Sequence, residues 1–283
     1  MDSTWQKGLS WGILFLGFAF LYVPIIVLIV YSFNESRLVT VWSGFSLKWY
    51  GELFNDSQMM RAVGVSLRIA FMSATSAVVL GTMAALIMVR FGSFKGKTLF
   101  TSMITAPLVM PEVITGLSLL LLFVSLDQFI GWPGGRGMTT IWIAHTTFCM
   151  AYVTVVVNSR LQEMDGSLEE AALDLGASRL KVFFLITLPI VSPALVAGWL
   201  LAFTLSLDDL VIASFVSGPG STTLPMEVFS SVRMGVSPKV NALSALLVTA
   251  IASVTFFAWW FMRRQERKRL ADLQAAKRQQ DIA

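Results

Sequence analysis

Long runs of apolar residues, each about twenty positions or more, recur along the chain and alternate with short polar stretches. A bilayer core of about 30 Å requires roughly 20 apolar residues in a helix, so each run predicts a membrane-spanning helix. The pattern predicts six such spans, at residues 11–33, 64–89, 98–126, 139–159, 190–217 and 241–262. The expected fold class is therefore all-α, in a polytopic membrane protein.

The first run, residues 11–33, is longer than the apolar core of a cleavable signal, which has about 7–15 residues. We therefore expect an uncleaved first span. The loop at 90–97 carries Arg90, Lys95 and Lys97 and no acidic residue. Basic loops remain on the cytoplasmic side, so this loop and both termini are expected to be cytoplasmic. The segments expected to face outward are 34–63, 127–138 and 218–240.

Composition agrees with a membrane protein, because 55% of the residues are hydrophobic and 13% are charged, whereas soluble domains carry about 25% charged residues. The single cysteine, Cys149, excludes an internal disulfide. The expected parts are 1–60, holding the first span and an outer loop, the main transmembrane domain 61–262, and the tail 263–283. We interpret this basic tail as a partner of anionic membrane lipid and not of nucleic acid.

The polar stretch at 160–189 predicts two short helices. Ser167 followed by Glu170 has the spacing of a capping box at the start of the first helix, and Gly176 supplies the left-handed residue that ends it. Its apolar positions follow the helical period and form one stripe, comprising Leu168, Ala171, Ala172 and Leu175. Ser178 is expected to cap the second helix, and Pro189 to limit its length.

The first helix, of about eight residues, is too short to be stable alone in water, where roughly 12–15 are needed. It must therefore pack on something. One interpretation is a loop helix lying on its own membrane domain. The other is an amphipathic helix presented to a groove on a cytoplasmic partner.

The same stretch resembles the EAA loop of ABC-importer permeases. Glu170-Ala171-Ala172 is followed after three residues by Gly176 and after nine more by Ile186-Thr187-Leu188-Pro189. The resemblance covers roughly residues 60–262 and the type-1 transmembrane domain, with this loop between the fourth and fifth spans. It implies a helix that docks on an ATP-hydrolysing subunit through four residues: Glu170, Ala171, Ala172 and Gly176.

The resemblance also implies a bacterial inner-membrane complex containing a second permease subunit, two ATP-binding subunits and a periplasmic binding protein. We expect this chain itself to be no enzyme and to hold no cofactor and no metal. Residues 92–98 resemble a phosphate-binding loop, but that motif needs four residues between its glycines and here there are three. ATP hydrolysis is therefore assigned to the partner.

Three acidic residues, Glu112, Asp208 and Asp209, lie within predicted spans, where an ionised side chain costs several kcal/mol. Pro111 is expected to begin a helical segment with Glu112 in its first turn. The helical rise places Glu112 and Asp208 roughly 21 and 27 Å from the inner ends of their spans, so neighbouring helices would bring them to one level. Adjacent residues point about 100° apart, so at most one aspartate faces a pore.

Residues 104–123, 201–225 and 230–247 resemble the second permease of putrescine and spermidine importers. That resemblance implies a multiply protonated amine as cargo, which carboxylates suit through charge-assisted hydrogen bonds. Cargo contact and a purely structural role remain alternatives for Glu112 and the aspartates. A secondary cation carrier or channel that uses Glu112, Asp208 and His145 is the rival class, with His145 otherwise hydrogen-bonded inside the bundle. An ABC permease for a different small solute is the other alternative.

Overall fold

The computed structural model describes residues 4–38, 41–235 and 237–253, and positions 256, 260, 263 and 264 singly. The chain divides into two compact units, one of residues 57–230 and the other of residues 1–56 with 231–283. Within the described part, regular structure is helical apart from one antiparallel bridge between Asn34 and Phe45. The all-α prediction is confirmed.

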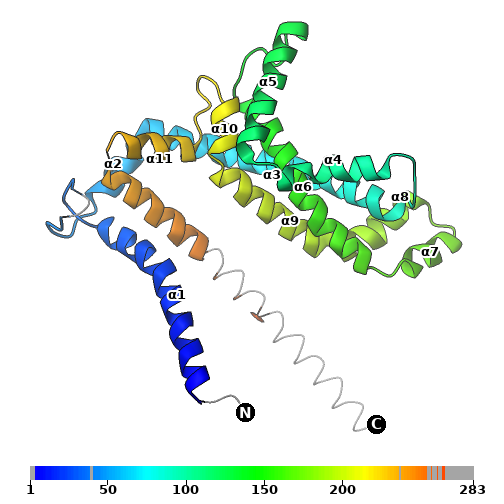
Figure 1. The fold of residues 1–283 in the computed structure, drawn as a ribbon, viewed down its shortest axis with the longest axis horizontal. Helices are drawn as coiled ribbons and strands as arrows, with labels where there is room; N and C mark the ends of the chain where they lie inside the picture. The colour runs from blue at the N-terminus through cyan, green and yellow to red at the C-terminus, as the bar shows by residue number, and fades with distance from the viewer. Residues whose placement is uncertain are drawn as a thin grey trace. The chain divides into compact units, whose positions relative to one another are not determined.

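Three long helices form the centre of the 57–230 unit. Helices α3 (Ser57–Arg90), α6 (Met138–Glu163) and α9 (Leu188–Asp208) pack on one another (Figure 1). Small side chains allow the close approach: a Cβ added to Gly81 of α3 would lie 2.9 Å from Val153 Cγ1 of α6. Between membrane helices such small residues let the backbones draw near and gain van der Waals contact.

The third predicted span, 98–126, is interrupted at Pro111, and a new helical segment begins there with Glu112 in its first turn, as predicted. Helix α4 (Lys97–Val109) ends before Met110, and α5 (Glu112–Ile130) begins after Pro111. Pro111 has no amide hydrogen to continue the helical ladder, and its ring disfavours helical geometry in the residue before it. Met110 accordingly adopts an extended conformation, with ψ 136°.

Pro189 does not end the second helix of the polar stretch, contrary to prediction. Helix α8 (Arg179–Val182), a π-helical turn (η1, Phe183–Thr187) and α9 form one continuous helix over Arg179–Asp208. The wider turn makes an i→i+5 bond from Leu188 N to Phe183 O. Pro189 has no N–H to donate to the preceding turn, and its ring clashes with a carbonyl of that turn. The wider π turn accommodates both effects.

The predicted span 190–217 is also divided. Helix α9 ends at Asp208, Asp209 and Leu210 intervene, and α10 (Val211–Val216) follows. Among the described residues, five helices are long and apolar enough to cross a membrane: Leu9–Tyr31, Ser57–Arg90, Glu112–Ile130, Met138–Glu163 and Arg179–Asp208. The sixth predicted span, 241–262, corresponds to a shorter apolar helix over Pro238–Ser253, and part of it lies outside the described residues. Six spans therefore remain a prediction.

The other unit contains α1 (Thr4–Tyr31) and α2 (Lys48–Phe54). Trp49 Nε1 donates to Asn34 O at 2.7 Å, and Lys239 Nζ lies 3.2 Å from Asp56 Oδ2. Helix α11 (Leu224–Arg233) lies across the sequence boundary between the units.

Loops of the 57–230 unit gather at its two ends. At one end Arg90, the last residue of α3, pairs with Glu169 in the 164–178 segment. At the other end Thr140 Oγ1 donates to Val216 O at 2.6 Å, and Arg136 Nη1 donates to Phe215 O at 3.2 Å. The basic loop and the polar stretch therefore share one end of the unit.

Candidate functional site

The first helix of the polar stretch forms as α7 (Ser167–Asp174), but its start differs from the prediction. The capping box of Ser167 and Glu170 is wrong: Gly166 occupies the N-cap position, which makes Ser167 the first helical residue. Asp165 Oδ1 instead accepts a hydrogen bond from Ser167 N at 3.0 Å. Hydrogen bonds from the Ser167 backbone and side chain lower the pKa of Asp165 below its ordinary value.

The end of α7 agrees with the prediction. Gly176 has φ +84°, a left-handed conformation that glycine adopts without steric cost. Gly176 N donates to Leu173 O at 2.9 Å, and Ala177 N donates to Ala172 O at 3.0 Å, which together make a Schellman motif. Ser178 Oγ then accepts from Lys181 N at 3.4 Å and caps α8 as expected.

The apolar stripe of α7 is only partly covered by the described part of its own chain. Helix α7 has no buried residue, and Leu168 and Leu175 are 49% and 90% exposed. Glu170 and Ala171 are exposed as well, while Ala172 is half-buried. Helix α7 lies at one end of the unit (Figure 1), and both of its stripe leucines are exposed there.

Glu169 is a residue that the sequence reasoning missed. Its Oε2 lies 2.9 Å from Arg90 Nε at the end of α3. Its Oε1 accepts a hydrogen bond from Thr187 Oγ1 at 2.6 Å, in the π turn before α9. No local pattern signals this contact, because Arg90 lies far away in sequence and Thr187 follows an irregular turn.

The intramembrane acids lie where two helices break. Glu112 begins α5, and Asp208 ends α9 just before α10. Helices α5 and α10 pack closely, since a Cβ on Gly116 would lie 2.7 Å from the Phe215 ring and 3.3 Å from Ile212 Cα. Glu112 lies one helical turn before Gly116 in α5, and Asp208 lies four residues before Ile212, across the break between α9 and α10. The predicted depth of Glu112 was counted along an unbroken helix from the inner end of the span. Because the helix breaks at Pro111, this count no longer gives the depth.

Asp209 is held by its own chain. Its Oδ1 accepts from Ala213 N at 3.0 Å and its Oδ2 from Ile212 N at 3.2 Å, so the carboxylate caps α10. Oδ1 also lies 3.5 Å from His145 Nε2, and the Asp209 side chain is 5% exposed. His145 Nδ1 is 2.7 Å from Ser206 Oγ, which places the histidine in a hydrogen-bonded contact inside the bundle.

Asp208 and Glu112 differ from Asp209 because both are exposed. Asp208 lies about 200° around α9 from buried Ser206, on the face turned away from α6. No basic side chain of the described residues forms an ion pair with either acid. Two exposed carboxylates are thus left without an ionic partner among the described residues.

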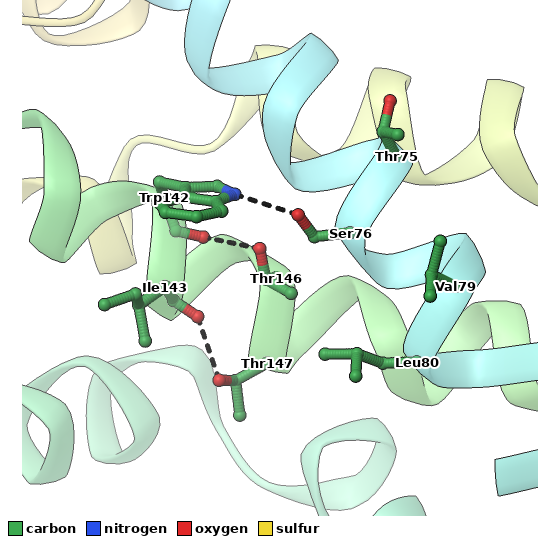
Figure 2. Close-up of a pocket in the computed structure, with 8 residues that line it drawn as sticks. All are labelled: Thr75, Ser76, Val79, Leu80, Trp142, Ile143, Thr146 and Thr147. Carbon is green, nitrogen blue, oxygen red and sulfur yellow. Dashed lines mark hydrogen bonds between the residues drawn. The ribbon is translucent and has the colours of Figure 1, made fainter. Parts of the chain in front are cut away.

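An open cavity of about 470 Å³ lies between α3 and α6 (Figure 2). Trp142 Nε1 donates to Ser76 Oγ at 3.2 Å, and Thr146 and Thr147 donate to the carbonyls of Trp142 and Ile143. Its lining carries no charged group and consists of Thr75, Ser76, Val79, Leu80, Trp142, Ile143, Thr146 and Thr147. The cavity therefore does not contain the intramembrane acids. Nor do three potential metal-ligating side chains come together among the described residues.

Comparison with known proteins places these features in context. Residues 77–270 match the family described as "Binding-protein-dependent transport system inner membrane component". The chain is 65% identical over 266 residues to the putrescine transport system permease protein PotI of Escherichia coli (strain K12), covering 94% of this chain and 95% of that protein. It is 42% identical over 231 residues to the spermidine/putrescine transport system permease protein PotC of the same strain, covering 82% and 85%.

The fold resembles a chain from the crystal structure of a bacterial ABC transporter involved in the import of the acidic polysaccharide alginate. The TM-score is 0.69 at 16% sequence identity, covering 93% of this chain and 98% of that chain. At this identity the likeness concerns the fold alone.

Proposed function

Because the chain belongs to the family of binding-protein-dependent transport system inner membrane components, we propose that it is the permease subunit of an ATP-driven importer of putrescine or spermidine. The observation that carries the cargo is the pair of exposed carboxylates, Glu112 at the start of α5 and Asp208 just before α10, two helices that pack together. The 65% identity to a putrescine permease over nearly the whole chain supports the same cargo.

The proposed complex pairs this chain with a second permease subunit, two ATP-binding subunits and a periplasmic polyamine-binding protein. The chain crosses the bacterial inner membrane six times, with both termini and α7 in the cytoplasm. Support for docking comes from the exposed stripe of α7, since Leu175 at 90% exposure lacks a cover in the described chain. Glu170, Ala171, Ala172 and Gly176 form or shape the surface that the ATP-binding subunit contacts, and that subunit hydrolyses ATP.

Transport proceeds by alternating access. Closure of the ATP-binding subunits moves α7, and rigid-body motion of the spans opens the passage to one side and then to the other. The breaks before α5 and α10 place polar backbone and carboxylates inside the membrane, where irregular backbone is tolerated only if it is buried in protein or lines a cavity. Discontinuous helices of this kind surround solute sites in other transporters.

A protonated amine complements such a passage. Each ammonium group donates hydrogen bonds to a carboxylate, and bonds between ions are roughly twice as strong as neutral ones. Attraction also grows as the local dielectric falls. Asp208 is the aspartate assigned to the passage, because Asp209 is already bonded to α10 and close to His145.

The proposal is tested by uptake in cells that lack their own polyamine import. Cells expressing the complete complex should accumulate labelled putrescine or spermidine, and should not accumulate a dicarboxylate of similar length. Uptake should require ATP hydrolysis by the associated subunit. Transport by this chain alone without nucleotide would favour the secondary carrier, and uptake of neutral solutes only would favour different cargo.

A further inference from the structure

We infer that Glu169 is a positioning residue that ties α7 to both α3 and α9, so that movement of the docking helix is transmitted to two spans at once. This inference rests on the proposed function, because it specifies how a docked α7 acts on the rest of its subunit. The inference concerns Glu169, whose neighbour Glu170 is the acid that the EAA pattern marks.

The two oxygens of Glu169 bind different elements. Oε2 pairs with Arg90 Nε at 2.9 Å, and Oε1 accepts from Thr187 Oγ1 at 2.6 Å. The side chains of Glu169 and Arg90 are 17% and 27% exposed, and Thr187 is 2% exposed. Because one carboxylate joins the end of α3 to the π turn before α9, displacing α7 relative to α3 breaks the ion pair with Arg90, and displacing it relative to α9 breaks the hydrogen bond from Thr187.

Little else fixes the orientation of α7. The helix has eight residues and none of them is buried, so packing against its own chain is slight. Short loops connect it to α6 and α8, and the second contains Gly176 at φ +84°. Without the contacts of Glu169, the helix has few restraints against pivoting on these loops when a partner pushes it.

Glu169 and Glu170 therefore divide two tasks. Adjacent helical residues point about 100° apart, so one side chain reaches the spans while the other faces outward. Glu170 is exposed, as is Ala171 beside it. The outward carboxylate belongs to the docking surface and the inward one transmits its movement.

The test is a double-mutant cycle in proteoliposomes that contain the complete complex. The measured quantity is the number of ATP molecules hydrolysed per amine transported. Glu169→Gln and Arg90→Gln should each raise this ratio about fivefold, which corresponds to losing a partly exposed ion pair. The double variant should show about the same rise and not the product of the two, because both changes remove one interaction.

Thr187→Val provides a milder variant, since it removes only the hydrogen bond to Oε1. It should raise the ratio about twofold. Glu163→Gln is the matched control, because it removes an exposed ion pair with Arg160 at 3.1 Å near the same end of the unit. It should leave the ratio unchanged. Co-purification of the ATP-binding subunit with each variant confirms that assembly is intact.

An unchanged ratio in Glu169→Gln and Thr187→Val, or multiplicative effects in the double variant, would overturn the inference. Glu170→Lys separates this failure from failure of the proposed function. If Glu170→Lys abolishes transport while Glu169→Gln behaves as wild type, only the transmission role is wrong. If the ATP-binding subunit never co-purifies with the unaltered chain, the proposed function itself fails.

Discussion

Helix α7 and the break after α9 each contain two adjacent acids, and in each pair the chain itself binds one carboxylate. In α7, Glu169 contacts Arg90 and Thr187 while Glu170 is exposed. At the end of α9, Asp209 caps α10 and lies near His145 while Asp208 is exposed. The first exposed acid faces water under the proposed topology, where it costs little. The second lies at membrane depth, where an exposed carboxylate requires a pore or a partner.

The comparison teaches that in each pair the carboxylate bonded within the chain positions a helix, whereas the exposed one remains available to a partner or a cargo. In the sequence, the EAA spacing marks Glu170 of the first pair, but nothing distinguishes Asp208 from Asp209. The choice depends on which backbone amides and side chains lie opposite each carboxylate, and these come from other helices. Variants of the paired residues can therefore break the comparison at each site.

The largest effect is expected from Glu170→Lys, which reverses the charge on the outward face of α7. Because like-charge contacts at an interface cost several kcal/mol, amine uptake should fall more than about tenfold while the protein still inserts in the membrane. Uptake assays with membrane fractionation measure both. Glu163→Lys, at an exposed site on α6, is the control, and equal loss in the two variants would remove the special role of Glu170.

Neutralising the exposed intramembrane acids should have the next largest effect. Glu112→Gln and Asp208→Asn should each raise the amine concentration needed for half-maximal uptake about fivefold, because each removes one charge-assisted contact with an ammonium group. Thermal stability should not change, since neither side chain pairs with a described basic residue. Normal kinetics in both single variants and the double variant would assign these acids a structural role only.

Asp209→Ala should show the reverse pattern. Removing the cap of α10 and the neighbour of His145 should lower the free energy of unfolding by about 2 kcal/mol. Thermal denaturation of the purified complex measures this loss, with Asp208→Asn as the matched comparison. A stable Asp209→Ala protein with impaired amine affinity would mean that the roles of the two aspartates are exchanged.

The smallest effect is expected from Ser167→Ala. Because Gly166 occupies the N-cap position, this change should alter stability and transport by less than about 0.5 kcal/mol. A true capping serine would cost about 1 kcal/mol when replaced. A loss of that size would show that the predicted capping box forms in the assembled complex.

Much of the fold follows from sequence because its signals are local. Apolar runs predicted the long helices, and Gly176 and Ser178 predicted the turn after α7 correctly. An error arose at Pro189, which was expected to limit its helix but lies within a continuous helix after a π turn, whereas Pro111 interrupts the third predicted span as expected. The residues around a proline in the sequence do not show whether the packing of neighbouring helices will favour a broken helix or a continuous one.

In the candidate sites too, local patterns marked some residues, whereas the contacts between distant residues could not be predicted. The EAA spacing marked Glu170, and apolar surroundings marked Glu112 and the aspartates. The contacts of Glu169 with Arg90, and of Asp209 with His145, join residues far apart in the chain. They depend on how α3, α6 and α9 pack, and no short-range pattern encodes that packing.

Cross-linking at position 175 tests most directly whether α7 docks on an ATP-binding subunit. Leu175 is 90% exposed, and the native Cys149 is buried, so Leu175→Cys introduces one accessible thiol into the described part of the chain. A short thiol-to-amine cross-linker should join this cysteine to the ATP-binding subunit in membranes, and Asp127→Cys near the opposite end should yield no such product. Cross-links from position 175 only to its own chain or to lipid would contradict the account.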